Sequence, residues 1–140
     1  MSEQPEVTAT WLGGFEAHVH ARGHEIAVDE PVQEGGTDAG VMPTELLCAS
    51  IASCFCLALA FCARKRGREL PGLEVAVRRV RAGRELRYER FEIEARADVP
   101  GEELAALIEP ARRVCWVSNT LAHGVELSYG YTSVDARTQR

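Results

Sequence analysis

The stretch ELLCASIASCFCLALAFCARKRG, from Glu45 to Gly67, decides the fold. It carries no charged residue between Leu46 and Ala63, a run long enough for a membrane-spanning helix. Its first half, however, is rich in Ala and Ser and only weakly apolar, and the flanking sequence has the amphipathic pattern of strands in a soluble protein. We therefore predict a buried core helix that begins near Pro43 and ends at a glycine cap, Gly67.

Alternating residues before this helix predict three strands. Residues 6–12 and 15–23 flank a Gly13-Gly14 pair and form a hairpin, and residues 24–31 form a third extended run that Pro31 ends. Residues 33–43 form a glycine-rich loop without periodicity. The chain therefore enters the central helix from a small antiparallel sheet.

After the helix, residues 73–77 and 91–99 alternate in the manner of a half-buried antiparallel pair. Residues 101–115 have the spacing of a second helix, in which Pro110 predicts a kink or a restart. Residues 125–131 are expected to form a last strand. Strands grouped around helices in this order indicate an α+β fold with antiparallel sheet, in one domain over residues 1–140.

The composition excludes several classes of protein. A chain of 140 residues with a net charge of −5 gives no reason to expect a nucleic-acid partner. The first residues lack both a basic start and an apolar run, so we expect no secretory signal, no membrane association and a cytoplasmic location. Five cysteines in such a chain indicate free thiols in a reducing compartment.

The central helix is apolar on nearly every side. A chain of this length has few other residues with which to bury the whole surface of such a helix. The small residues in its first half would let another backbone approach closely. We therefore expect a partner subunit to cover the exposed part, in a homodimer.

Four of the five cysteines lie in this helix: Cys48, Cys54, Cys56 and Cys62. Since a helix advances about 100° and 1.5 Å per residue, Cys54 and Cys56 point about 200° apart, and Cys48 and Cys62 lie about 9 and 12 Å from Cys54 along the axis. A disulfide needs Cα atoms within about 7 Å. If Cys54 has a disulfide partner in the same chain, that partner is therefore Cys115.

Two segments carry a resemblance to a known family. GGTDAGVMPTELLCASIASC, residues 35–54, and VCWVSNTL, residues 114–121, resemble the OsmC/Ohr family of thiol peroxidases. Members have a glycine-rich loop, a P-x-E-L-L-type helix start, a reactive cysteine about nine residues later, and a second cysteine far downstream. These features fall on Pro43, Glu45, Cys54 and Cys115.

The resemblance implies an OsmC-like intertwined homodimer, in which antiparallel sheets wrap two long central helices. It implies an antioxidant, stress-response enzyme that reduces organic hydroperoxides. Cys54 would attack the peroxide as a thiolate and become a sulfenic acid, Cys115 would condense with it to a disulfide, and an external dithiol, a lipoyl protein or a thioredoxin-like protein, would reduce the disulfide. The family requires no cofactor or metal for this chemistry.

A reactive thiolate needs a cation or a helix N-terminus beside it. The hydroperoxide-reductase branch has an Arg at the position of Phe15, so we nominate Arg22 as the cation, with Glu45 as its orienting partner. His18 and His20 share one face of a strand, where we expect solvent-facing side chains and no metal site. The alternative function is a non-catalytic thiol redox sensor or a protein that binds a small hydrophobic molecule.

Overall fold

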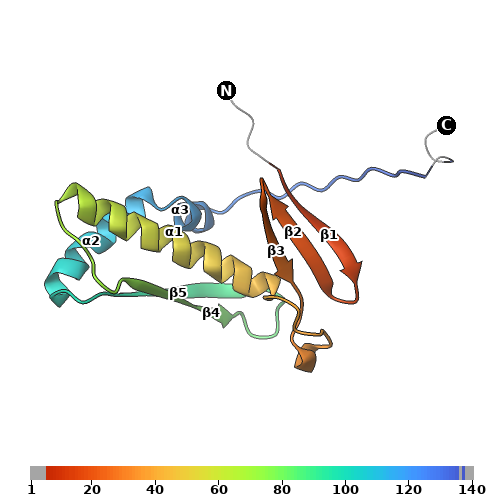
Figure 1. Ribbon diagram of the computed structural model, residues 1–140, viewed down its shortest axis with the longest axis horizontal. Helices are drawn as coiled ribbons and strands as arrows, with labels where there is room; N and C mark the ends of the chain where they lie inside the picture. Colours follow the sequence, from red (N-terminus) through yellow and green to blue (C-terminus); the bar gives the residue numbers. More distant parts are fainter. Residues whose placement is uncertain (1–5, 136, 138–140) are drawn as a thin grey trace.

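The computed structural model describes residues 6–135 and 137 of the chain. It is an α+β structure with two antiparallel sheets and a long central helix (Figure 1), as the sequence predicts. In chain order the elements are β1 (Val7–Gly13), β2 (Glu16–Ala21), β3 (His24–Val28), a short 3-10 helix η1 (Val32–Glu34), α1 (Pro43–Lys65), β4 (Glu74–Arg81), β5 (Tyr88–Arg96), α2 (Gly101–Val114) and α3 (Trp116–His123). Strands β1, β2 and β3 form one sheet in that order, and β4 pairs with β5 in the other.

The β1–β3 sheet has one apolar and one polar face. Its register places Ala9 opposite Val19, and Val19 opposite Ile26, so apolar side chains share one face. This face is open in the single chain, where Trp11 keeps 74% of its surface exposed and Val7 67%. An apolar sheet face of this kind requires a cover that residues 6–135 and 137 do not provide.

The loop between β3 and α1 is organised by Asp29, whose side chain is buried. Its carboxylate accepts hydrogen bonds from the backbone N–H of Glu30 (2.7 Å), Thr37 (3.1 Å) and Ala39 (3.1 Å), and from the Thr37 hydroxyl (2.7 Å). The Thr37 hydroxyl, followed by the Ala39 N–H, lowers the pKa of Asp29 to about 2 against the effect of burial. The anion therefore fixes the glycine-rich loop from inside.

The same loop passes so close to β3 and to Glu30, just after it, that two of its residues must be glycine. A Cβ at Gly36 would lie 1.9 Å from the Glu30 carbonyl oxygen, and one at Gly40 would lie 2.2 Å from that of Ala27. The close approach lets Val41 form a parallel bridge with Val28, just before α1 begins. The loop therefore ties the start of α1 to the end of β3.

Helix α1 is the one described helix that is long and apolar enough to cross a membrane, a test that the core helix of a soluble protein also passes. Its second half forms the core, where Phe55, Leu59 and Cys62 pack with Leu107 and Ala111 of α2. Side chains of β4 and β5 close this core from the sheet side. The opposite side of α1 is open, since Leu57 is 70% exposed and Phe61 50%. The predicted core helix is thus confirmed, with one side uncovered in the single chain.

Helix α2 runs through Pro110 as a single helix from Gly101 to Val114, so the predicted restart at this residue is wrong. Proline has no N–H and leaves the carbonyl four residues earlier, that of Ala106, without its helical donor. The Arg66 guanidinium, from the end of α1, donates to this carbonyl at 3.5 Å. A side chain from the neighbouring helix thus replaces the lost hydrogen bond.

The chain after Cys115 differs from the prediction. Residues 116–123 form a separate helix, α3, and residues 125–131, expected as a strand, pair with no strand in the described part of the chain. This segment runs extended away from α3 and past the β1–β3 sheet (Figure 1). Its alternating Val125, Leu127 and Tyr129 are exposed. A strand needs a neighbouring strand for its backbone hydrogen bonds, and this single chain supplies none here.

Candidate functional site

Cys54 and Cys115, 61 residues apart in sequence, meet at the junction of three helices. Cys54 lies on α1, is partly exposed and packs against the core cluster that contains Cys115. Cys115 is fully buried and forms the link between α2 and α3. Both cysteines are free, and Cys54 is one of the neighbours that lower the pKa of Cys115. The fold thus brings together the two cysteines that the sequence singles out.

The environment of Cys115 favours its thiolate. Burial raises the pKa of this thiol, but hydrogen bonds outweigh that effect and the net pKa is lowered. The donors are the Ser118 hydroxyl, the backbone N–H groups of Ser118 and Val117, and the Cys54 thiol. Because Cys115 is the N-cap of α3, these N–H groups belong to the first turn of a helix, where such groups lack a helical acceptor. The structure therefore stabilises a negative charge on the second cysteine of the pair.

The other three cysteines lie elsewhere on α1. Cys62 is buried in the core beside Leu59, and Cys48 and Cys56 are partly exposed. Cys56 points about 200° away from Cys54 around the helix, and Cys48 and Cys62 lie about 9 and 12 Å from it along the axis. These three cysteines therefore serve as small apolar residues of the helix.

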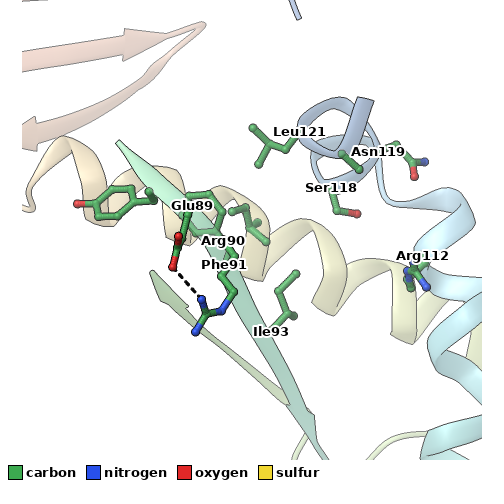
Figure 2. Close-up of a pocket in the computed structure, with 11 residues that line it drawn as sticks. Glu89, Arg90, Phe91, Ile93, Arg112, Ser118, Asn119 and Leu121 are labelled. Carbon is green, nitrogen blue, oxygen red and sulfur yellow. Dashed lines mark hydrogen bonds and ion pairs between the residues drawn. The ribbon is translucent and has the colours of Figure 1, made fainter. Parts of the chain in front are cut away.

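A cavity of about 510 Å³ lies between α3 and β5, beside the cysteine pair. Its apolar lining comes from Ile51, Phe91, Ile93 and Leu121, and Arg90 and Arg112 contribute charge. Figure 2 shows Ser118 and Leu121 of α3 on one side and Phe91 and Ile93 of β5 on the other.

Neither Cys54 nor Cys115 is among the lining residues of this cavity, but two lining residues neighbour them in the chain. Ser118 lines it and also donates to Cys115, and Ile51 lies one turn before Cys54 on α1. The cavity is therefore suited to an apolar molecule that approaches the pair from the side of α3.

Glu45 and Arg22 are not brought together within this chain. The Glu45 carboxylate accepts the backbone N–H of Met42 at 2.9 Å and thereby caps the start of α1. Arg22 lies in the β2–β3 turn, at the opposite end of β3 from the Val28–Val41 bridge that leads into α1. In Figure 1 this turn is the end of the hairpin that points away from α1. Their role beside Cys54 remains a prediction.

Phe15, at the position of the family Arg, contacts the glycine-rich loop: a Cβ on Gly35 would lie 3.2 Å from its ring. His18 and His20 share the polar face of β2, as the alternation predicts. There, His18 Nδ1 lies 2.5 Å from Glu25 Oε1, and His20 Nδ1 lies 3.8 Å from Glu25 Oε2. Across residues 6–135 and 137, no group of three or more His, Cys, Asp or Glu side chains is placed to hold a metal ion.

Sequence reasoning missed the surroundings of Cys115. The Ser118 hydroxyl donates to the Cys115 carbonyl oxygen at 3.4 Å and also lowers the pKa of the Cys115 thiol. Arg112, three residues before Cys115, lines the cavity and forms an ion pair with Glu109. The available signal was the spacing C-W-V-S, in which a hydroxyl residue stands three places after the cysteine.

Comparison with known proteins identifies a family and similar structures. The family model described as OsmC-like protein matches residues 36–130. An OsmC-like protein from Mycoplasma pneumoniae has a similar structure, with a TM-score of 0.73, 18% identity, and coverage of 87% of this chain and 89% of that one. An organic hydroperoxide resistance protein OsmC from Legionella pneumophila gives a TM-score of 0.63 and 22% identity over 84% of this chain and 90% of that one.

A third similar structure is an organic hydroperoxide resistance protein from Elizabethkingia anophelis, with thiocyanate bound. Its TM-score is 0.59 and its identity 28%, with 85% of this chain and 89% of that one covered. Comparison with curated protein sequences finds no match.

Proposed function

Because this chain belongs to the OsmC-like protein family, we propose that it is a cysteine-based peroxidase that reduces organic hydroperoxides. The observation that carries the proposal is the contact between Cys54 and Cys115, two free thiols from distant parts of the sequence. Solved structures that resemble this chain are named organic hydroperoxide resistance proteins, which supports the same chemistry.

Cys54 is the residue that reacts first, since it is partly exposed and Cys115 is fully buried. Its thiolate attacks one peroxide oxygen, so that an S–O bond forms, the O–O bond breaks, and the alkoxide leaves as an alcohol after it takes up a proton. Cys54 is then a sulfenic acid. Cys115 attacks the Cys54 sulfur, and a disulfide forms as hydroxide leaves. An external dithiol, such as a lipoyl or thioredoxin-like protein, reduces the disulfide and restores both thiols.

The substrate is an apolar hydroperoxide. The cavity beside the cysteine pair has walls of Phe91, Ile93 and Leu121, which favour an alkyl or aryl group. Hydrogen peroxide has no apolar surface to bury there. Arg22 and Glu45 are the candidates to activate Cys54, and in this chain Arg22 would have to come from a partner subunit.

We infer that the working form is a homodimer. Its support is the uncovered apolar surface of α1 at Leu57 and Phe61, the open face of the β1–β3 sheet, and the unpaired segment 125–131. Sedimentation at micromolar concentration is expected to show twice the 15.4 kDa of one chain. A single species of one chain's mass would exclude the dimer.

The function is tested by peroxide consumption in the presence of a dithiol. Wild-type protein is expected to turn over cumene hydroperoxide, Cys54→Ser to lose turnover, and Cys115→Ser to react once and then stall or over-oxidise. Cys56→Ser, on another side of the same helix, is the matched control and should retain activity. Turnover in Cys54→Ser at the wild-type rate would exclude the proposed mechanism.

The second candidate is a non-catalytic thiol sensor or a protein that binds a small hydrophobic molecule. The observation that favours it is Phe15, an apolar side chain where the hydroperoxide-reductase branch has an Arg. A sensor would oxidise with one equivalent of peroxide but would not turn over with added dithiol, so the same assay separates the two functions.

A further inference from the structure

The loop between β4 and β5 presents an apolar side chain among positive charges. Leu86 keeps 98% of its surface exposed. The basic tip, which we define as residues 81–87, also carries three exposed arginines and one acid: Arg81, Arg84, Arg87 and Glu85. It lies at the end of the two-stranded sheet nearest the start of α1 (Figure 1). A chain with a net charge of −5 thus gathers positive charge around one exposed leucine.

Backbone hydrogen bonds hold the basic tip in one shape. The Ala82 N–H donates to the Arg87 carbonyl at 3.1 Å, and the Glu85 N–H donates to the Ala82 carbonyl at 3.0 Å. Gly83, with a φ of 55°, takes the left-handed conformation that this turn requires. Ala82 is buried, which anchors the loop to the sheet. Leu86 is therefore exposed on an ordered loop.

The positive charges of the basic tip are only partly neutralised. The Arg87 guanidinium donates to the Glu85 carboxylate at 2.5 Å. Arg81 donates to the Glu85 backbone carbonyl at 3.3 Å, a group without net charge. Arg84 has no ion pair with any other residue in the described part of the chain. Two of the three arginines thus keep their charge without a paired acid, and they attract a negatively charged partner.

The size of the basic tip restricts the kind of partner. A stable protein–protein interface buries about 800 Å² and about 20–30 residues on each side, whereas the tip has seven residues. A lipid bilayer needs less contact, since one apolar side chain can enter below the head groups while cations meet the phosphates. The cytoplasmic leaflet of a membrane is rich in anionic lipid. An exposed leucine between arginines fits such a surface better than it fits a protein.

We propose that the basic tip docks this protein on an anionic lipid surface, with Leu86 below the head groups and the three arginines at the lipid phosphates. The sequence predicts no membrane association, and the proposal revises that expectation for one loop, because the exposure of Leu86 is visible only in the structure. The tip contains none of the residues that we assign to the dimer surface. The proposal does not depend on the proposed function.

Docking through the basic tip brings the substrate cavity to the membrane. Tyr88 follows the tip directly, and it lines both a hollow of about 340 Å³ at the tip and the cavity of about 510 Å³ between α3 and β5. Apolar hydroperoxides partition into bilayers, because burial of their alkyl surface is favourable. A docked chain therefore meets such molecules where they collect.

Co-sedimentation with vesicles tests the docking. The full chain is mixed with vesicles of phosphatidylcholine alone, or of two parts phosphatidylcholine to one part phosphatidylglycerol. Wild type should bind the anionic vesicles, and should dissociate as added salt shortens the screening length from about 8 to about 3 Å. Arg84→Gln should weaken this binding about fivefold, and Leu86→Ser at least about tenfold.

Two matched controls alter side chains of the same kind elsewhere. Arg96→Gln removes an exposed arginine at the far end of β5, about 26 Å along the strand from the tip. Val134→Ser removes an apolar side chain that is 89% exposed. Both variants should bind anionic vesicles as wild type does.

A second measurement follows the depth of residue 86 in the bilayer. With the signal of wild type subtracted, Leu86→Trp should shift its fluorescence to shorter wavelength on anionic vesicles and should be quenched by brominated lipid tails. Val134→Trp should do neither.

Binding to neutral vesicles as strong as to anionic ones, no binding to anionic vesicles, or unchanged binding in both tip variants would overturn the proposal. The last result would place the contact on another surface, such as the apolar side of α1 at Leu57 and Phe61. Peroxide turnover is measured without vesicles, so failure of the docking is distinct from failure of the proposed function.

Discussion

Gly40→Ala tests the tight connection between β3 and α1. A Cβ at this position would lie 2.2 Å from the Ala27 carbonyl oxygen and 2.8 Å from the Val28 nitrogen. Real Cβ atoms essentially never approach another heavy atom closer than 3.0 Å, so the two segments must separate by at least 0.8 Å, the difference between 3.0 and 2.2. Both contacts are backbone, which cannot swing away as a side chain can.

This separation costs stability in two ways. Overpacking of a well-packed site costs about 1–3 kcal/mol. The movement also weakens the hydrogen bond from the Asp29 N–H to the Val41 carbonyl, 3.0 Å long, which adds about 1 kcal/mol. We therefore expect the free energy of unfolding to fall by about 2–4 kcal/mol, and the melting temperature to fall by about 10 °C.

Urea denaturation followed by circular dichroism measures this difference. Gly101→Ala is the matched control, because Gly101 opens α2 and a Cβ there meets no atom within 4 Å. The control should stay within about 0.5 kcal/mol of wild type. If Gly40→Ala is as stable as Gly101→Ala, the loop does not pack against β3 as described.

The remaining predictions concern charge, core and substrate. Because the pKa of Asp29 falls from 3.8 to about 2 on folding, its contribution to stability is present above about pH 4 and is lost as the pH falls toward 2; denaturation of wild type and Asp29→Asn across that range should show their difference shrink. Leu59→Ala, at a fully buried core position, should lower the free energy of unfolding by about 3 kcal/mol in the same assay, and a loss below about 1 kcal/mol would contradict the core described. Cumene hydroperoxide should react up to about a hundredfold faster than hydrogen peroxide, since about 100 Å² of buried apolar surface contributes up to about 2.5 kcal/mol. Phe91→Ala should reduce this preference in stopped-flow rates, whereas equal rates for both peroxides in wild type would exclude an apolar substrate site.

The elements that could be predicted from sequence are those with a local signal. The Gly13-Gly14 turn between two alternating runs predicts the first hairpin, and the uncharged run after Pro43 predicts α1. The boundary at Cys115 has no such signal. Cysteine is not among the usual N-cap residues, so nothing in the local sequence separates α2 from α3.

The segment 125–131 alternates as a strand does, but strand formation depends on a neighbour. In the single chain that neighbour is absent from the described residues, and the backbone remains extended and unpaired. A second copy of the chain is the partner that the proposed dimer would supply. The sequence pattern thus indicates how this segment behaves with a partner, and not how it lies alone.

The cysteine pair was accessible from sequence because the family resemblance points to Cys54 and helix geometry excludes the other three cysteines of α1 as its partner. The electrostatics of this cysteine pair could not be predicted from sequence, because they depend on how α3 packs. The sequence predicts a cation beside Cys54, whereas the resolved change in the structure is a lowered pKa at Cys115. The capping role of Glu45 was also hidden, because the residue it caps is Met42 and not the Ser or Thr of the usual motif. The roles of Arg22 and Glu45, and the cytoplasmic location, remain predictions.

Peptide mapping after one equivalent of cumene hydroperoxide tests the central claim most directly. The oxidised protein is digested without reduction, and the cross-linked peptides are identified by mass spectrometry. We predict a bridge between Cys54 and Cys115 within one chain, formed with the loss of two thiols per chain. A bridge from Cys48, Cys56 or Cys62, or the retention of all five thiols, would contradict the account.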